Sequence, residues 1–324
     1  MPVAFRDYYK VLEVPRDATE ADIRKAFRKL ALRYHPDVAT DKATADARFK
    51  EVNEANEVLS DPEKRRRYDQ LGEHWDKPER PTHSAGAGYN PAAGSAQDFH
   101  FGGTGFSDFF ETFFGSGSGS QSSEFGRTRN PRPGSERFAQ RGRDIEGDIL
   151  VTLEEVFLGA TRIITLQRSD PRTGQSSTQN LRVKIPVGVR QAQRIRLAGK
   201  GHEGEGGGEP GDLFLRVRLA THPEFAVRGA DLFYELDVAP WEAVLGTTVQ
   251  IRTLDGTVSL KVPAGTAAGQ QLRLRHKGLP ESDGTRGHLF VGISVQVPPD
   301  PTPQERALWE EMARQSTFDP RKPS

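Results

Sequence analysis

The tripeptide His35-Pro36-Asp37 places an imidazole and a carboxylate on either side of a rigid residue. A hydrolytic site would need a nucleophile, a base and a group that orients the base, or a metal ion in their place. The residues around the tripeptide supply no such set. Pro36 restricts its own backbone and biases His35 toward an extended conformation. The pattern therefore predicts a stiff recognition loop and not a catalytic centre.

Two helix-forming segments flank this loop and must position it. The first begins at Thr19-Glu20-Ala21-Asp22, which is typical of a capping box except that Asp stands where Glu or Gln is usual. Its apolar residues follow at helical spacing: Ile23, Phe27, Leu30, Ala31 and Tyr34. The second presents Phe49, Val52, Ala55, Val58 and Leu59 in the same way, and Pro62 suits the first turn of a further helix. We predict an antiparallel helical hairpin with the tripeptide at its tip.

These features closely resemble the J-domain family. Asp7 to Leu12 is similar to the opening helix of that domain, and Glu63 to Asp69 to its closing helix. The resemblance implies that the tripeptide and the basic face of the second helix bind a DnaK-type chaperone and trigger its ATP hydrolysis. The implied contacts are His35, Pro36, Asp37, Arg24, Arg28, Lys29 and Lys50. Asn56 departs from the family, whose members usually carry an aromatic residue there, so we expect a slightly looser hairpin.

Composition limits the remaining possibilities. The 324 residues suffice for two or three domains, and 45 basic residues balance 45 acidic ones, which gives no overall sign of nucleic-acid binding. The absence of cysteine excludes disulfides, thiolate metal sites and thiol catalysis. We expect no metal and no cofactor. The amino terminus lacks the apolar stretch of a signal peptide, and no apolar run approaches the roughly 20 residues that span a bilayer. These features predict a soluble, cytoplasmic protein.

Residues 76–143 form a linker rich in Gly, Ser and Pro. It contains two Phe-rich stretches, Phe99 to Gly103 and Phe106 to Gly115. One interpretation is a short helix whose Phe face packs on a neighbouring domain. The stretch also resembles the Gly/Phe-rich region of J-domain proteins, which docks on the J-domain or helps to bind clients. Either interpretation implies an intramolecular contact, because several exposed Phe side chains favour aggregation.

The end of the linker is basic, with one acidic residue, Glu136, among six arginines: Arg127, Arg129, Arg132, Arg137, Arg141 and Arg143. Such a run is usually a solvated tether. A flexible basic arm is also suited to weak, salt-sensitive contact with DNA phosphates. No aromatic residues alternate with the arginines, so the pattern does not support sequence readout.

An internal repeat organises the C-terminal half. Residues 147–160 are echoed by 236–247, Val183 to Gly188 by Leu260 to Gly265, and 193–197 by 270–274. Alternating apolar and polar residues between Gly and Pro turns predict short strands, so the repeat indicates two similar β-rich modules, each with one brief helix. Glycine-rich residues 199–208 fail the phosphate-loop pattern and are predicted to form a turn.

The two modules resemble the paired client-binding domains of DnaJ-type co-chaperones, in the branch without a zinc insert. The resemblance implies a client groove that includes Ile149, Ile164, Leu166 and Phe225, although each could equally be a core residue. Ile164 and Leu166 share one strand face. An exposed edge beside that face could accept an extended client segment as an added strand.

The tail predicts a short helix. Thr302, Pro303 and Glu305 combine a cap, a first-turn proline and a capping-box glutamate. Its apolar stripe is Leu308, Trp309 and Met312. The stripe could pack on the second β module, or on the same helix of another chain as in the family's dimers, which we favour. Residues 316–322 and the zinc-free layout resemble bacterial J-domain proteins that also bind DNA in the nucleoid.

The sequence therefore predicts a multidomain protein: an all-α J-domain (1–75), a flexible linker (76–143), two mainly β sandwich-like domains (144–224 and 225–300) and a dimerisation helix with its tail (301–324). The predicted function is a heat-shock co-chaperone of the stress response, without enzymatic activity of its own. Its expected partners are a DnaK-type chaperone, unfolded polypeptides, double-stranded DNA and a second copy of the chain, with no membrane. The alternative is a nucleoid DNA-binding protein in which the J-domain has a secondary or regulatory role.

Overall fold

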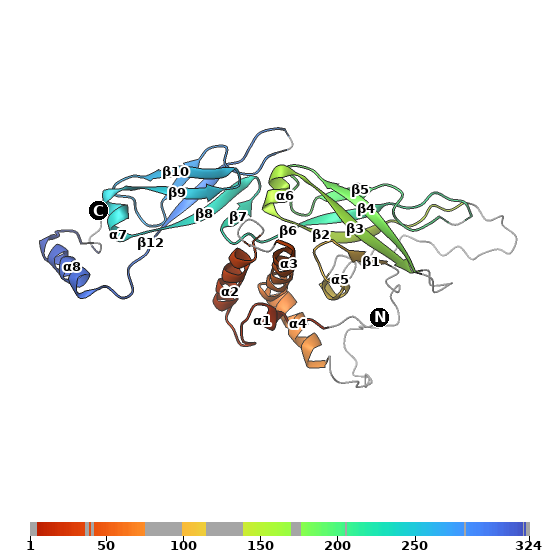
Figure 1. Ribbon diagram of the computed structural model, residues 1–324, viewed down its shortest axis with the longest axis horizontal. Coiled ribbons are helices and arrows are strands. Elements are labelled where there is room, and N and C mark those ends of the chain that lie inside the picture. Colours follow the sequence, from red (N-terminus) through yellow and green to blue (C-terminus); the bar gives the residue numbers. More distant parts are fainter. Residues whose placement is uncertain are drawn as a thin grey trace.

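A helical domain lies beneath the junction of two β domains, and a last helix stands apart at the far end (Figure 1). This computed structural model describes residues 5–35, 39, 42–74, 99–114, 139–169, 176–204, 206–281, 283–319 and 321. The order of helices, linker, β-rich region and C-terminal helix agrees with the predicted multidomain fold.

The helical domain consists of α1 (Tyr8–Val11), α2 (Glu20–Arg33), α3 (Lys42–Leu59) and α4 (Pro62–His74). The predicted capping box is present: the Asp22 amide donates to the Thr19 hydroxyl, and the Thr19 amide donates to the Asp22 carboxylate. The helices bury the predicted apolar faces: Ile23, Phe27, Leu30, Ala31, Phe49, Val52, Ala55, Val58 and Leu59. Pro62 starts α4, as expected at a first helical turn. The hairpin of α2 and α3 therefore holds His35 at its tip.

Part of the linker folds against both neighbouring domains. Strand β1 (Phe99–Gly102) pairs with the first β domain, and helix α5 (Asp108–Phe114) follows it. The ring of buried Phe109 contacts Tyr8 and Tyr68 of the helical domain. The Ser107 amide and hydroxyl both donate to the buried Glu54 carboxylate, at 2.7 and 2.6 Å. A Phe-faced helix packed on a neighbouring domain was one of the two sequence interpretations.

The first β domain contains two three-stranded sheets. Its elements are β2 (Ile145–Val151), α6 (Leu153–Leu158), β3 (Ala160–Ser169), β4 (Ser176–Ile185), β5 (Arg194–Leu197) and β6 (Leu213–Leu219). One sheet has the order β1-β3-β4 and the other β2-β6-β5, with β2 and β6 parallel. The apolar residues that alternate along these strands form the core between the sheets.

The second β domain has a similar arrangement, but its sheets have four strands, in the order β11-β12-β8-β7, and two strands, β9 and β10. Its elements are β7 (Phe225–Arg228), β8 (Asp231–Val238), α7 (Pro240–Leu245), β9 (Thr247–Thr253), β10 (Gly256–Val262), β11 (Gln271–Leu274) and β12 (Leu289–Val295). The parallel pair β8 and β12 corresponds to β2 and β6. Helices α6 and α7 both end at a glycine with positive φ, Gly159 at 74° and Gly246 at 79°, a conformation that favours glycine. The predicted internal repeat is thus confirmed.

Helix α8 (Pro303–Gln315) extends beyond the second β domain. The predicted capping box is present, since the Glu305 amide donates to the Thr302 hydroxyl while the Thr302 amide donates to the Glu305 carboxylate. Within the described residues, no helix has the length and apolar character needed to cross a membrane.

Candidate functional site

His35 follows the C-terminal end of α2 and lies in the contact between the helical domain and the first β domain. It is 5% exposed, and its Nε2 lies 3.3 Å from Oε1 of Glu154. The rings of Phe49 and His222 stand edge-on to the imidazole, with centroids 5.6 and 5.0 Å away. The side chain of the predicted trigger is therefore covered by another domain. Its companions Pro36 and Asp37 lie outside the described residues.

Glu154 is held in the first turn of α6. The helix begins at a capping box, in which the Thr152 hydroxyl accepts from the Glu155 amide. Burial alone raises the pKa of Glu154, but hydrogen bonds from His222 and His35 outweigh it and hold the pKa well below its usual range. The carboxylate is consequently ionised near neutral pH and can bind two imidazoles at once.

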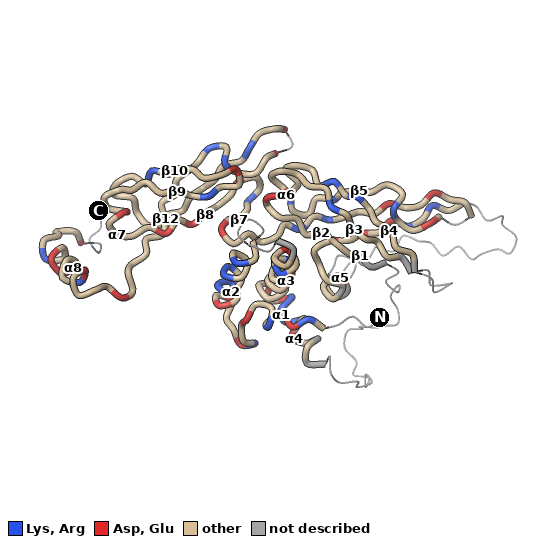
Figure 2. Tube along the Cα trace, viewed as in Figure 1, with Lys and Arg blue, Asp and Glu red and all other residues tan. Residues whose placement is uncertain are grey.

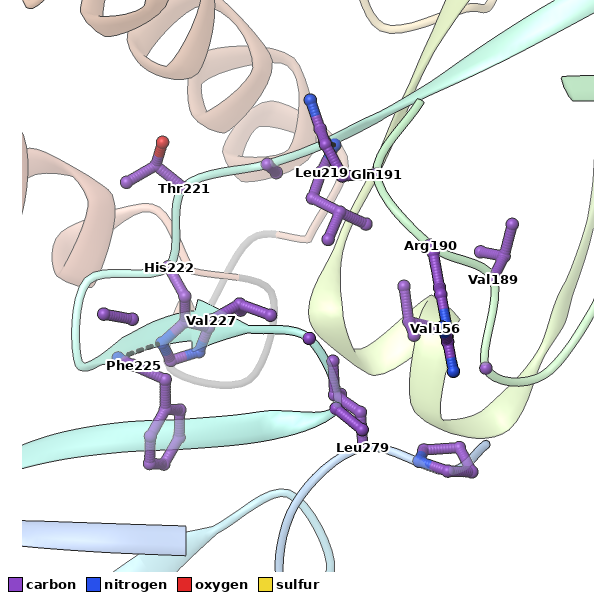
Figure 3. Close-up of a pocket in the computed structure, with 16 residues that line it drawn as sticks. Val156, Val189, Arg190, Gln191, Leu219, Thr221, His222, Phe225, Val227 and Leu279 are labelled. Atoms are coloured by element: carbon purple, nitrogen blue, oxygen red, sulfur yellow. Dashed lines mark hydrogen bonds between the residues drawn. The ribbon is translucent and has the colours of Figure 1, made fainter. Parts of the chain in front are cut away.

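His222 lies in the connection between β6 and β7 and is oriented by the backbone. Its Nδ1 accepts a hydrogen bond from the amide of Phe225 at 3.1 Å (Figure 3). It also accepts one from the amide of Glu224 at 3.1 Å. Because Nδ1 accepts, the proton of the neutral ring lies on Nε2. That nitrogen is 3.4 Å from the same Glu154 oxygen that faces His35. His222 also lines a cleft of about 570 Å³ between the two β domains.

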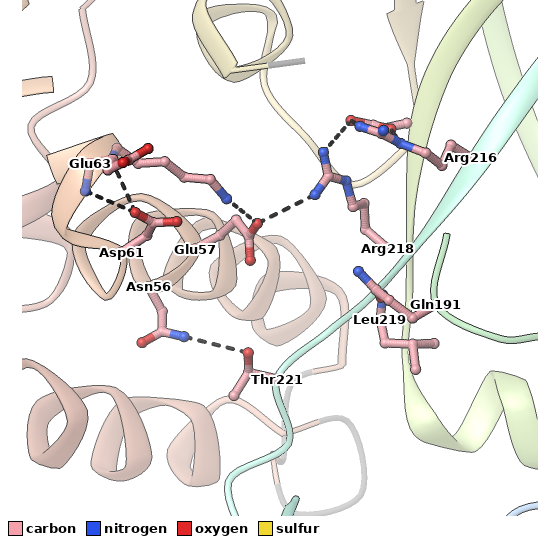
Figure 4. A network of polar contacts seen from close by, with 11 residues as sticks. Asn56, Glu57, Asp61, Glu63, Gln191, Arg216, Arg218, Leu219 and Thr221 are labelled. Carbon is pink, nitrogen blue, oxygen red and sulfur yellow. Dashed lines mark hydrogen bonds and ion pairs between the residues drawn. The ribbon is translucent and has the colours of Figure 1, made fainter. Parts of the chain in front are cut away.

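A second polar contact joins α3 to the first β domain (Figure 4). The Asn56 amide donates to the Thr221 hydroxyl at 3.4 Å. Next to it, Arg218 lies 3.7 Å from Glu57 and 3.2 Å from the buried carboxylate of Asp148. Polar contacts thus hold the helical domain at two points, at His35 beyond the end of α2 and at Asn56 and Glu57 near the C-terminal end of α3.

The basic face of α2 remains exposed. Arg24, Arg28 and Lys29 are all exposed, and Figure 2 shows basic residues along this helix. Arg24 pairs with Glu20 of its own helix, and Arg24 and Arg28 line a cleft of about 730 Å³ that faces the second β domain. Lys50 of α3 pairs with Asp46 at 2.5 Å. The predicted docking residues of α2 are therefore accessible while His35 is not.

The predicted client residues lie in the core. Ile149, Ile164, Leu166 and Phe225 are all buried. The edge of β3 beside Ile164 and Leu166 is paired with the chain's own β1, in antiparallel register from Phe99 opposite Arg168 to Gly102 opposite Thr165. This edge does accept an extended segment, as expected, but here the segment belongs to the linker. Client contact by these side chains stays a prediction.

Most of the predicted DNA-binding arginines, Arg127, Arg129, Arg132 and Arg137, lie outside the described residues. Of the other two, Arg141 pairs with Asp212 at 2.9 Å and Arg143 is exposed.

The predicted dimerisation stripe of α8 is only partly covered within the chain. Trp309 packs beside Trp241, with ring centroids 6.1 Å apart. Leu308 and Met312 are exposed, at 71% and 53%. Dimerisation through them stays a prediction.

Comparison with known proteins decides the family. Residues 7–69 match the DnaJ domain, and residues 145–298 match the DnaJ C terminal domain. The chain is 45% identical over 323 residues to a protein of Coxiella burnetii called Curved DNA-binding protein, covering 98% of both chains. Proteins of the same name from Pseudomonas putida and Serratia proteamaculans are 40% and 41% identical, over 98% of this chain and 98% and 97% of theirs. The chain belongs to the DnaJ family. Because it contains no cysteine, this J-domain protein cannot carry the cysteine-bound zinc insert.

Sequence reasoning missed Glu154, His222 and the role of Asn56. Glu154 stands in the sequence as one acidic residue of a helix start, and His222 as one of several scattered histidines. Both lie more than a hundred residues from His35 in the sequence, and they contact it only because the J-domain docks on the first β domain. Asn56 was the one available signal, since a polar residue at an apolar position indicates a polar partner.

Proposed function

We propose that this DnaJ-family protein is a co-chaperone, which binds non-native polypeptides and stimulates ATP hydrolysis by a DnaK-type chaperone. The proposal rests on one combination: a J-domain with His35-Pro36-Asp37 beside the exposed basic face of α2, joined to two DnaJ-type C-terminal domains. Each exposed ion pair with the partner contributes about 0.2–1 kcal/mol, so docking is weak and salt-sensitive. The protein itself hydrolyses no ATP in this proposal and requires no cofactor or metal.

His35→Gln separates the two activities. Stimulation of the DnaK-type ATPase is expected to fall to the unstimulated rate, because Gln cannot reproduce the imidazole contact. Client binding, measured by suppression of aggregation of an unfolded polypeptide, is expected to stay within about twofold, because β3 and its edge are unchanged. Parallel loss of both activities would refute this division of labour.

We also propose that the protein binds double-stranded DNA and associates with the nucleoid in the cytoplasm. The names of the curated relatives favour this second function, and the basic arm of the linker suits it. Preference for bent DNA would reflect the energy of deforming the duplex and not base contacts. Alternatively, DNA binding is the primary activity and the J-domain is regulatory.

Neutralising Arg127, Arg129 and Arg132 to Gln tests the arm. If each contacts one phosphate, the slope of log affinity against log salt should fall by about 2.7, at roughly 0.9 per contact. The matched control neutralises Arg252, Lys261 and Arg273 of the second β domain, and it should leave the slope unchanged. An unchanged slope in the linker variant would show that the arm does not contact DNA.

A further inference from the structure

We propose that the first β domain is a docking surface for the J-domain of the same chain, and that His35, Glu154 and His222 form a latch that withholds the trigger from the partner chaperone. The inference rests on the proposed co-chaperone function. The segment that occupies this surface is the J-domain of the same chain, through His35 after α2 and through Asn56 and Glu57 of α3. The latch is closed in this structure, since one carboxylate oxygen faces both imidazole nitrogens at 3.3 and 3.4 Å.

Burial makes docking and triggering mutually exclusive. A partner that contacts the imidazole of His35 requires that imidazole to be accessible. In this structure the imidazole is enclosed by Phe49, His222 and Glu154. Both histidine side chains are only 6% exposed. The partner therefore cannot contact His35 until the J-domain leaves the first β domain.

The cluster has the composition of a metal site, but its hydrogen bonds oppose that role. The three side chains offer ligand atoms within 4.8 Å of one another. However, a metal on Nε2 of His222 needs a lone pair there, while Nδ1 already accepts two backbone hydrogen bonds. The ring would have to lose both protons, whereas metal-binding histidines normally donate from the second nitrogen. The geometry favours a carboxylate that accepts from imidazole, and hence a latch that opens without a metal.

Asn56 gives the latch a second, independent contact. Asn56 stands where the family usually carries an aromatic residue, and its side-chain amide donates a hydrogen bond to the Thr221 hydroxyl. The carboxylate of Glu57, the next residue, forms ion pairs with Lys64 at 2.5 Å and with Arg218 at 3.7 Å. The departure from the J-domain pattern thus lies in the docking interface.

The latch covers the trigger and leaves the basic docking face open. Arg24, Arg28 and Lys29 remain exposed in the closed arrangement. The partner can consequently bind the basic face first and gain His35 only after the latch opens. A closed latch should therefore lower the maximal stimulation more than it lowers the apparent affinity for the partner.

The cysteine-free chain permits a direct test by disulfide trapping. In the full chain, Asn56→Cys with Thr221→Cys should cross-link under mild oxidation, because Nδ2 of Asn56 and Oγ1 of Thr221 lie 3.4 Å apart. The oxidised protein should stimulate the partner ATPase at least about tenfold less than the reduced protein, and reductant should restore it. The control pair, Asn56→Cys with Ser259→Cys, should not cross-link, since Ser259 lies on β10 of the second β domain.

Glu154→Ala provides the converse test, with Glu209→Ala on an exposed loop as control. Loss of the shared carboxylate should increase ethoxycarbonylation of His35 by diethyl pyrocarbonate several-fold and raise maximal stimulation. Failure of the cysteines to cross-link, or full stimulation by the oxidised protein, would overturn the latch. If the reduced protein gave no stimulation, the proposed function would fail, while cross-linking and His35 modification would still decide whether the J-domain docks.

Discussion

A single carboxylate organises the residue-scale contacts around His35. Glu154 would be costly to bury alone, yet the two imidazoles that face it supply hydrogen-bond donors and keep it ionised. His222 can serve as a donor because the backbone fixes its tautomer. Glu154 and His222 belong to the first β domain, so only the contact with His35 requires that the J-domain dock there.

Asp148 is a second carboxylate whose removal should be measurable. Its side chain is 1% exposed and pairs with Arg216 at 2.9 Å and Arg218 at 3.2 Å. Asp148→Asn removes the counter-ion of Arg216 and leaves Arg218 only its longer pair with Glu57, so it should lower the free energy of unfolding of the first β domain by about 2–3 kcal/mol. This is less than a fully buried pair would lose, because both arginines are partly exposed. Urea unfolding of the full chain measures the change.

Glu146→Gln is the matched control for Asp148. The Glu146 pair with Arg194 is exposed on both sides, at 45% and 60% for the two side chains. Its loss should cost less than about 1 kcal/mol. Equal effects of the two substitutions would contradict the assignment of Asp148 as the buried anchor of Arg218.

At the scale of elements, the linker contributes two short pieces that could not be stable alone. Helix α5 has seven residues, fewer than an isolated helix requires in water. It is ordered by Phe109 and Phe110, which are buried, and by the hydrogen bonds from Ser107 to Glu54. Strand β1 needs the edge of β3 in the same way. Both elements therefore depend on contacts with the neighbouring domains for their stability.

Ser107→Ala tests how α5 is held. The substitution removes the hydroxyl that donates to Glu54 and accepts from the Phe110 amide. Loss of such a cap costs about 0.5–2 kcal/mol, so amide hydrogen exchange across residues 108–114 should accelerate by about 2–30-fold. Ser259→Ala on exposed β10 should leave this exchange unchanged. No acceleration in Ser107→Ala would mean that Phe packing alone orders the helix.

The hairpin of β9 and β10 should be acid-sensitive through Asp255. Burial alone raises the pKa of Asp255. Hydrogen bonds from the side chains of Thr253, Arg286 and Lys277 outweigh this effect and hold the pKa below its usual value of 3.8. Because the folded state has the lower pKa, the stabilisation is complete above pH 3.8 and is lost as pH falls toward the folded value. The free energy of unfolding of the second β domain should fall below about pH 4. Urea unfolding, followed by tryptophan fluorescence in a Trp75→Phe background, measures it. Asp255→Asn should remove this part of the pH dependence, and an unchanged profile would contradict the assignment.

At the scale of the whole molecule, local patterns predicted the elements but not their docking. The Thr19 capping box, the apolar face of α2 and the internal β repeat are encoded by neighbouring residues, and all three are confirmed. Pairing of β1 with β3 and of His35 with Glu154 depends on segments far apart in the chain. The periodicity of apolar residues does not predict such contacts. The one sequence signal of a contact between domains was Asn56, a polar residue where the family usually has an aromatic one. The predicted client residues show the same limit, because alternation identifies a buried face without saying what covers it.

A dimer through α8 is the main whole-molecule prediction. Leu308 and Met312 leave an apolar stripe exposed, which a second copy could cover and thereby double the client sites. Leu308→Asp should convert the dimer into a monomer and weaken binding of long clients more than short ones, as measured by light scattering and client affinity. Leu158→Asp, at an exposed apolar position of α6, should leave the mass unchanged. A wild-type monomer at micromolar concentration would contradict this prediction.

Single-turnover ATP hydrolysis by a DnaK-type chaperone tests whether Glu154 withholds His35, with four forms of the full chain: wild type, His35→Gln, Glu154→Ala and the double variant. We predict more stimulation by Glu154→Ala than by wild type, and none by either form that lacks His35. That result would show that Glu154 acts by withholding His35. Stimulation that survives His35→Gln, or that Glu154→Ala fails to raise, would contradict a latched trigger.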